Sequence, residues 1–169
     1  MKAMNNDLIE NLRLVDVELV SNLHGRCFFD AWDSKTISQN LKKAGAFGLV
    51  SRGTGGQSIV GFAIARIAID ECELLTLGVA PECRAIGFGA QLLQATMKRA
   101  VIEKAKWIFL EVSEDNIAAL RLYRSHGFIK VGNRPQYYEN SDGTRSDAYT
   151  MRDALPNFNI FVKKDDVLH

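Results

Sequence analysis

Hydrophobic positions in the first half of the chain change from helical spacing to strand-like runs. Two helices are predicted, near residues 15–28 and 34–44. Three strands are predicted after them, at 46–51, 59–69 and 73–79. The glycine-rich stretch 53–56 lies between the first two runs, and glycine supplies the positive φ that hairpin turns need. The three strands should therefore form an antiparallel meander.

Apolar residues then return to helical spacing. Between 87 and 104 they fall at i, i+4 and i+8, which predicts a helix with one buried face. The remaining predicted elements are a strand at 107–112, a helix at 116–125 and strands at 128–132 and 147–151. A strand–helix–strand passage implies a right-handed crossover between parallel strands. The predicted fold class is a mixed α/β domain of three layers, with a ligand beyond the carboxyl end of strand 73–79.

Composition and charge exclude several classes of protein. The 169 residues, 47% hydrophobic and 24% charged, fit one globular domain rather than a disordered chain. Lys and Arg number 21 against 20 Asp and Glu, so a nucleic-acid partner held by bulk charge is excluded. No run reaches the ~20 apolar residues that span a bilayer, and the first residues contain no signal-peptide core. We therefore expect no membrane partner and a cytoplasmic location.

The cysteines and histidines predict neither a disulfide nor a metal site. Cys27, Cys72 and Cys83 are widely spaced, form no CxxC pair and accompany only three histidines. Free, reduced thiols are therefore expected.

Candidate chemistry is concentrated where strand 73–79 ends. Gly87 and Gly89 open the long helix, and free N–H groups with the helix dipole favour an anion such as a pyrophosphate there. An ordinary helix start, at which glycine only relieves packing, fits the same two residues. A dinucleotide fingerprint is a rival, with Glu111 as its ribose acid. Its third glycine is absent, however, and seven residues separate Val79 from Gly87.

Two longer patterns carry a resemblance to a known family. They are Val79-x-Pro81-x-x-Arg84-x-x-Gly87-x-Gly89, and Asn116-x-x-Ala119-x-x-Leu122-Tyr123 followed by Gly127-Phe128. Together they resemble the acetyl-coenzyme A motifs of GNAT-type N-acetyltransferases. A narrower resemblance, to the ribosomal-protein-alanine N-acetyltransferases, rests on Leu110-Glu111-Val112, Arg134 with Tyr137-Tyr138, and residues 143–151. The resemblance covers about residues 10–152, so we predict one acetyltransferase domain over 1–152 and a tail of unassigned role over 153–169.

The resemblance implies a GNAT-like fold: a mixed, mostly antiparallel sheet with a parallel pair splayed around the cofactor and helices on both faces. The cofactor would be acetyl-coenzyme A, used as a co-substrate without a metal. Its pantetheine would bond to the backbone of Leu77, Gly78 and Val79. Its diphosphate would lie on the amides of Ala85, Ile86, Gly87, Phe88, Gly89 and Ala90. The resemblance also makes Arg84 and Tyr123 candidate cofactor-binding residues. Relatives often have Gln-Arg where this chain has Arg84-Ala85, so the arginine charge is shifted by one position from the family pattern.

The resemblance also assigns catalytic roles. Glu111, the one charged residue in an apolar strand, would be the general base, although a strand-end carboxylate facing solvent fits the same position. Tyr123 would protonate the departing thiolate, the alternative being an aromatic packed in the core. Asn116 would bind the cofactor, or would serve only as a helix cap.

Further residues are candidates for binding the acceptor. Glu73, at the start of the cofactor strand, is a second candidate base or an exposed strand end. Arg134, Tyr137 and Tyr138 are expected in a loop, where they would line a peptide groove or pack the loop itself.

The predicted function is acetyl transfer from acetyl-coenzyme A to the N-terminal α-amine of a protein, with alanine of a ribosomal protein as the implied acceptor. A lysine side chain or a small amine is an alternative acceptor. A non-catalytic acyl-coenzyme A-binding regulatory module is an alternative of another class. The sequence does not fix the oligomeric state.

Overall fold

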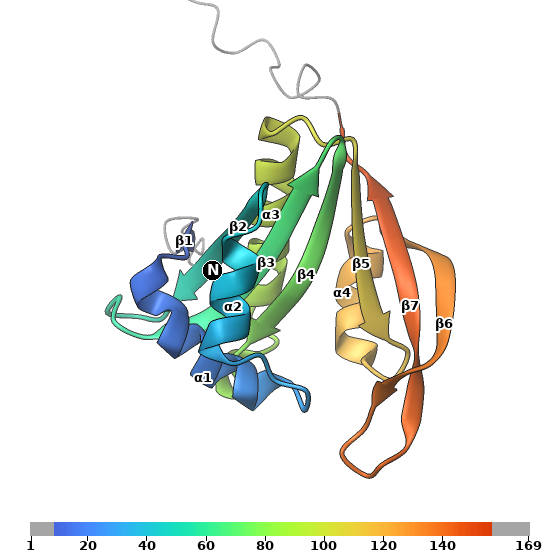
Figure 1. The fold of residues 1–169 in the computed structure, drawn as a ribbon, viewed down its shortest axis with the longest axis horizontal. Coiled ribbons are helices and arrows are strands. Elements are labelled where there is room, and N and C mark those ends of the chain that lie inside the picture. The colour runs from blue at the N-terminus through green and yellow to red at the C-terminus, as the bar shows by residue number, and fades with distance from the viewer. Residues whose placement is uncertain (1–8, 157–169) are drawn as a thin grey trace, which may run out of the picture.

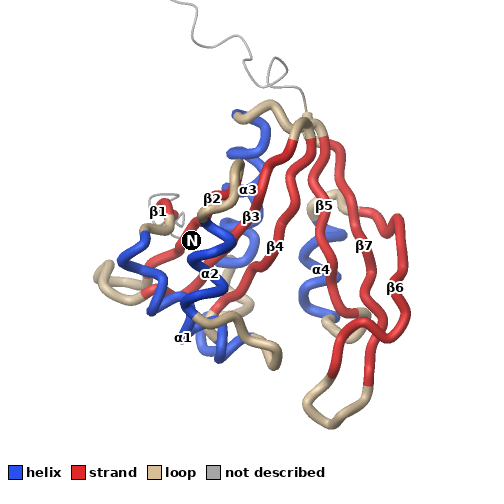
Figure 2. Tube along the Cα trace, in the orientation of Figure 1, coloured by secondary structure: helices blue, strands red, loops and turns tan. Residues whose placement is uncertain are grey.

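The computed structural model describes residues 9–156, which form one sheet with helices on both faces (Figure 1). The strands are β1 (Ile9–Asn11), β2 (Ala46–Arg52), β3 (Ile59–Ala68), β4 (Glu71–Val79), β5 (Trp107–Ser113), β6 (Ile129–Glu139) and β7 (Arg145–Ala154). The helices are α1 (Val17–Cys27), α2 (Ser34–Leu41), α3 (Phe88–Ile102) and α4 (Ile117–Ser125), with short 3-10 helices η2 (Leu14–Asp16) and η3 (Pro81–Cys83). The sheet order is β1-β2-β3-β4-β5-β7-β6 (Figure 2).

The predicted mixed α/β class is confirmed. Among the strands of residues 9–156, β4 and β5 are parallel and the other neighbours are antiparallel. Helix α3 connects β4 to β5, which is the predicted crossover. In the turn between β2 and β3, Gly55 and Gly56 have positive φ, as the hairpin prediction requires. No helix in this part of the chain is both long and apolar enough to cross a membrane.

The edges of the sheet differ from the sequence predictions. Strand β1 was not predicted, because its three residues are too few to show alternation. The prediction that Arg134, Tyr137 and Tyr138 lie in a loop is wrong. All three lie in β6, whose pairing with β7 is irregular between Arg134 and Tyr138. β6 is exposed along almost its whole length, so no alternation of apolar residues marks it as a strand.

The last strand is longer than predicted. β7 begins at Arg145 and continues to Ala154, which pairs with Trp107 on β5, and the next residue, Leu155, is buried. The sheet therefore extends past the boundary predicted at 152. Residues 157–169, most of the predicted tail, lie outside the described part of the chain.

The sheet separates two hydrophobic cores. Helices α3 and α4 cover one face, whose core includes Leu92 and Leu120. Helices α1 and α2 cover the other face, whose core includes Val20 and Ile37. In Figure 1, α1 and α2 lie in front of the sheet, and α3 and α4 lie behind it. A side chain on a central strand therefore points to one helical layer or to the other.

The parallel strands β4 and β5 stay together for only four residues each. Their last pair is Leu74 with Leu110. Beyond it β4 remains paired with β3 as far as Val79, while β5 remains paired with β7 as far as Ser113. The register between β3 and β4 shifts at this point, which makes Leu75 the extra residue of a β-bulge. Because bulges bend strands, this one accounts for the separation of β4 from β5 that Figure 1 shows.

Candidate active site

The end of β4 leaves backbone groups free on the side that faces β5. Ala80 donates its N–H to the carbonyl of Val60 (2.8 Å), which fixes the alternation of hydrogen bonds along the β3–β4 pair. By this alternation the peptide groups of Gly78 turn toward β3, and those of Leu77 and Val79 turn toward the separated strand. The predicted backbone contacts are therefore possible at both groups of Leu77 and at the N–H of Val79, whose carbonyl already accepts from two side chains. The groups of Gly78 are used within the sheet.

Gly78 is needed for a different reason. A Cβ placed there would lie 2.6 Å from Cζ of the fully buried Phe62. The glycine therefore makes room for an aromatic ring, and the bulge of this strand lies at Leu75.

The loop between β4 and α3 presents a run of unused amides. No N–H group of residues 85–90 donates to an acceptor within the described residues. The first backbone hydrogen bond of α3 is donated by the N–H of Gln91 to the carbonyl of Gly87 (3.1 Å). Ala85 (φ 61°) and Gly87 (φ 103°) have left-handed backbone conformations on either side of Ile86. Successive amides in such a conformation form a concave nest for an anion, and the N-terminus of α3 adds its dipole. A diphosphate fits this arrangement.

The side chain of Arg84 is directed elsewhere. Its Nε donates to the carbonyl oxygen of Val79 (3.1 Å), which also accepts a weak bond from Cys27 Sγ (3.4 Å). Arg84 thus holds the end of β4 in place. This geometry supports the amides, rather than the guanidinium, as the principal anion contacts.

Glu111 is the first residue of β5 after the last pair with β4. Its neighbours Leu110 and Val112 are buried in the α3–α4 core, so the Glu111 side chain lies on the α1–α2 face. Its Oε1 accepts from Arg134 Nη1 at 2.7 Å, and this bond is the main cause of the raised pKa of Arg134. The Glu111 side chain retains 29% exposure, so solvent or an acceptor can reach the carboxylate.

The hairpin of β6 and β7 brings its residues that were predicted to bind the acceptor substrate close to Glu111. The Arg134 guanidinium lies over the ring of Tyr137 at 4.1 Å, and the rings of Tyr137 and Tyr138 meet edge to face at 5.1 Å. Burial raises the pKa of Tyr138 to about 12, and the nearby charge of Glu111 acts in the same direction. Arg134, Tyr137, Tyr138 and Glu111 thus form one cluster, although they come from two strands.

Tyr123 approaches from the opposite helical layer. It lies on α4, is 7% exposed and packs against Phe128, with ring centroids 5.7 Å apart. Burial raises the pKa of Tyr123, and the electrostatic interaction with Tyr138 acts in the same direction. The Tyr123 hydroxyl has no hydrogen-bond partner among residues 9–156. The Tyr123 ring is therefore part of the core, and its protonated hydroxyl is free to donate a hydrogen bond.

Asn116 is a helix cap, as one of its two interpretations expects. Its Oδ1 accepts from the N–H of Ala119 at 3.1 Å, and this bond starts α4. The amide nitrogen of the same side chain makes no bond within the described residues. It can therefore donate to a ligand while the cap remains intact.

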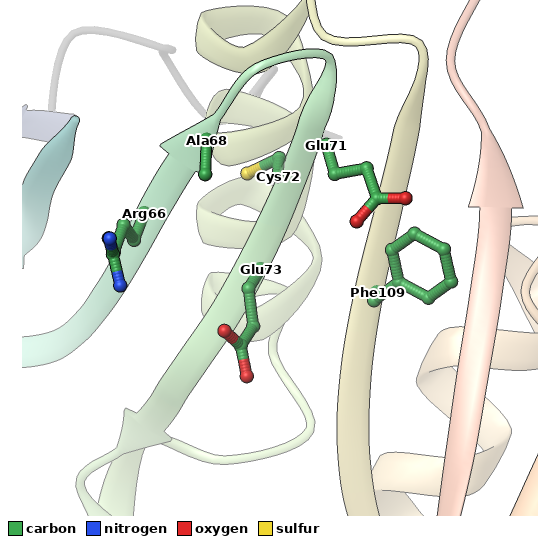
Figure 3. A pocket seen from close by; sticks show the side chains of 6 residues that line it. All are labelled: Arg66, Ala68, Glu71, Cys72, Glu73 and Phe109. Carbon is green, nitrogen blue, oxygen red and sulfur yellow. The ribbon is translucent and has the colours of Figure 1, made fainter.

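Glu73 lies before the point at which the strands separate. It pairs in register with Phe109, and both line a shallow hollow of about 250 Å³ on the face of β3, β4 and β5. Figure 3 shows the hollow, which is lined by Arg66, Ala68, Glu71, Cys72, Glu73 and Phe109. Glu111 follows the last β4–β5 pair and Glu73 precedes it, so Glu111 lies nearer to the opening between the strands.

One polar pair beside this site was not predicted from the sequence. His24 on α1 is 2% exposed and its Nε2 lies 3.1 Å from Thr76 Oγ1 on β4. The available signal was the helical spacing of Val17, Val20 and His24, which puts a histidine on the buried stripe of α1.

The described residues contain three free cysteines and no group of three potential metal ligands. The free thiols are as predicted.

A family model described as the acetyltransferase (GNAT) family matches residues 17–128. The chain belongs to this family and is an N-acetyltransferase. It is 31% identical over 149 residues to the [Ribosomal protein bS18]-alanine N-acetyltransferase of Escherichia coli K12, with 88% of this chain and 96% of that protein covered. It is 34% identical over 147 residues to the N-alpha-acetyltransferase RimI of Mycobacterium tuberculosis, with 83% and 88% covered.

Solved structures of other proteins have a similar fold. The ribosomal-protein-S18-alanine N-acetyltransferase from Escherichia coli has a TM-score of 0.81 and 26% identity, covering 95% of this chain and 97% of that one. Arabidopsis thaliana NAA60 in complex with acetyl-CoA has a TM-score of 0.75 at 20% identity, covering 87% and 97%, and shares the fold. The GNAT-like fold predicted from the two motifs is confirmed.

Proposed function

We propose that this protein transfers an acetyl group from acetyl-coenzyme A to the N-terminal α-amine of a protein, with the alanine of a ribosomal protein as acceptor. The observation that carries the proposal is the separation of β4 from β5 directly after Leu74 and Leu110. One side of the opening has free backbone groups and an amide nest, and the other side has a carboxylate. The acceptor class is supported by the names of the relatives. Such a reaction belongs in the cytoplasm, where ribosomal proteins are made.

Backbone groups supply most of the cofactor contacts in this proposal. The amides of residues 85–90 bind the diphosphate. Pantetheine bonds to the backbone groups of Leu77 and to the N–H of Val79 at the free side of β4, and Asn116 donates its remaining N–H groups to the cofactor. The N–H groups turned toward the opening also lie where they can stabilise the oxyanion that forms on the thioester carbonyl.

Acetyl transfer needs a neutral amine. An α-amine titrates near ~7.7–8 and a lysine amine near ~10.4, so an N-terminus needs only modest help from a base. Glu111 accepts the amine proton, directly or through a water, and Arg134 fixes the carboxylate at 2.7 Å. The amine nitrogen bonds to the carbonyl carbon, the carbon–sulfur bond breaks, and the thiolate takes a proton from Tyr123.

The experiment that tests this function is acetyl transfer to a peptide that carries both an N-terminal alanine and an internal lysine. We expect the α-nitrogen to be acetylated. A lysine acetyltransferase would modify the other nitrogen, and a non-catalytic acyl-coenzyme A-binding module would bind the cofactor and release no thiol.

The substitution Gly87→Ala should raise the KM for acetyl-coenzyme A about tenfold with little change in kcat. A φ of 103° costs an alanine roughly 1–2 kcal/mol, which the loop relieves by turning its amides away from the nest. The matched control is Gly55→Ala, since Gly55 has φ 96° in the β2–β3 turn and no heavy atom within 4 Å of the added Cβ. Steady-state kinetics with varied acetyl-coenzyme A measures both. An equal rise in KM for the two variants would show that the nest does not bind the cofactor.

A further inference from the structure

His24 links the loop between α1 and α2 to strand β4. The backbone N–H of Trp32 in that loop donates to His24 Nδ1 at 3.1 Å. Ser21 on α1 holds the same loop residue by donating its hydroxyl to the Trp32 carbonyl at 3.2 Å. On its other side, His24 Nε2 lies 3.1 Å from Thr76 Oγ1. One side chain therefore joins the loop and the strand.

The histidine is neutral in its surroundings. Its ring packs between aromatic side chains, with centroids 4.5 Å from Phe28 and 5.4 Å from both Trp32 and Phe62. Burial lowers the pKa of His24 to about 4, against a smaller opposing effect of Asp30. Near neutral pH the ring thus carries one proton.

The hydrogen bonds decide where that proton is. A backbone N–H can only donate, so Nδ1, which faces the N–H of Trp32, must be the acceptor. The ring proton is therefore on Nε2 and is donated to Thr76 Oγ1. Thr76 accepts this bond and keeps its own hydroxyl proton, for which residues 9–156 provide no acceptor.

Thr76 stands beside the opening between the strands. It directly follows the bulge residue Leu75 and pairs with Ile64, whose side chain is in the α1–α2 core. The Thr76 side chain thus lies on the same face as Glu111, and the two residues flank the opening from β4 and β5. An acceptor whose amine meets Glu111 brings its next atoms toward Thr76.

We propose that Thr76 donates its hydroxyl proton to the carbonyl oxygen of the acceptor's first residue, and that His24 is the positioning residue that orients this hydroxyl. The inference rests on the proposed function and adds to it a basis for choosing the acceptor. An N-terminal amine has a peptide carbonyl two bonds away, whereas a lysine side-chain amine has none. A single donor opposite Glu111 therefore favours N-termini over lysine side chains.

The test compares two acceptors on variants of the full chain. One acceptor is a peptide that begins with alanine, and the other is the same peptide with its first peptide bond replaced by an alkene, which keeps the shape and removes the carbonyl oxygen. Thr76→Val removes the hydroxyl at nearly constant volume. The Thr76→Val variant should have a kcat/KM about tenfold lower than wild type for the peptide. Its kcat/KM for the alkene analogue should equal that of wild type. Thr76→Ser should retain most of the wild-type value.

The histidine is tested by His24→Phe, which keeps an aromatic ring in the cluster and removes both hydrogen bonds. It should reduce kcat/KM for the peptide by a similar factor, and His24→Phe with Thr76→Val should be no worse than Thr76→Val alone. The KM for acetyl-coenzyme A should not change. A loss that is equal for both acceptors, or no loss in Thr76→Val, would overturn the inference while the proposed function stands. A wild-type protein that acetylates neither acceptor would overturn both.

Discussion

Replacement of Tyr123 by phenylalanine should lower kcat by about two orders of magnitude and leave the KM for acetyl-coenzyme A unchanged. The ring is buried and packs on Phe128, so phenylalanine preserves the packing and removes only the hydroxyl. General acid catalysis typically contributes ~10²–10⁴-fold. Because burial raises the pKa of Tyr123, its hydroxyl remains protonated across the neutral range and is available to the departing thiolate.

Initial rates of thiol release at saturating peptide measure this effect. Tyr149→Phe is the matched control, since Tyr149 lies on β7 and packs against the same core as Tyr123, but its hydroxyl bonds to Glu114 at 3.2 Å. The control should retain nearly full activity. An undiminished kcat in Tyr123→Phe would show that the thiolate obtains its proton from solvent.

The second large effect is expected from Glu111→Gln. Glutamine keeps a hydrogen-bond acceptor for Arg134 but cannot take a proton from the amine. The rate should fall about a hundredfold below pH 7, and the difference from wild type should narrow above pH ~8. This trend follows because an α-amine titrates near ~7.7–8, so that at high pH the acceptor is already neutral.

A pH profile of kcat/KM for the acceptor peptide measures the dependence. Glu73→Gln provides the control, because Glu73 is a strand carboxylate on β4 that precedes the separation of the strands. It should have a small effect at every pH. A larger loss in Glu73→Gln than in Glu111→Gln would reverse the assignment of the base.

The central part of the fold could be predicted because its sequence signals are local. The apolar stripe of α3, the glycines of the β2–β3 turn and the crossover from β4 to β5 each depend on residues that are close in the chain. The glycine loop before α3 was likewise visible, since Gly87 adopts the positive φ that its residue type permits.

Other features depend on contacts that no local pattern reveals. The bulge at Leu75 sets where the strands separate, yet leucine is an ordinary strand residue. Strand β6 lacks apolar alternation because both of its faces are largely exposed. The bond of His24 to Thr76 joins residues 52 positions apart, and the Glu111–Arg134 pair joins residues 23 apart. Such pairs become visible only when the sheet order is known.

The balanced charge of the chain is consistent with an anionic cofactor. A net charge of +1 excludes binding by bulk charge, but in the proposed site the amides of residues 85–90 and the N-terminus of α3 would attract a diphosphate without adding to the count. Net charge therefore carries little information about a site built from backbone groups.

The most direct test of the central claim is to find which nitrogen receives the acetyl group. The purified protein is incubated with acetyl-coenzyme A and a peptide that begins with alanine and contains an internal lysine, and the product is sequenced by tandem mass spectrometry. The same peptide with a blocked N-terminus is the control. One acetyl group is expected on the α-nitrogen, and no reaction is expected of the blocked peptide. Acetylation of the lysine in both peptides, or cofactor binding with no transfer to either, would contradict the claim.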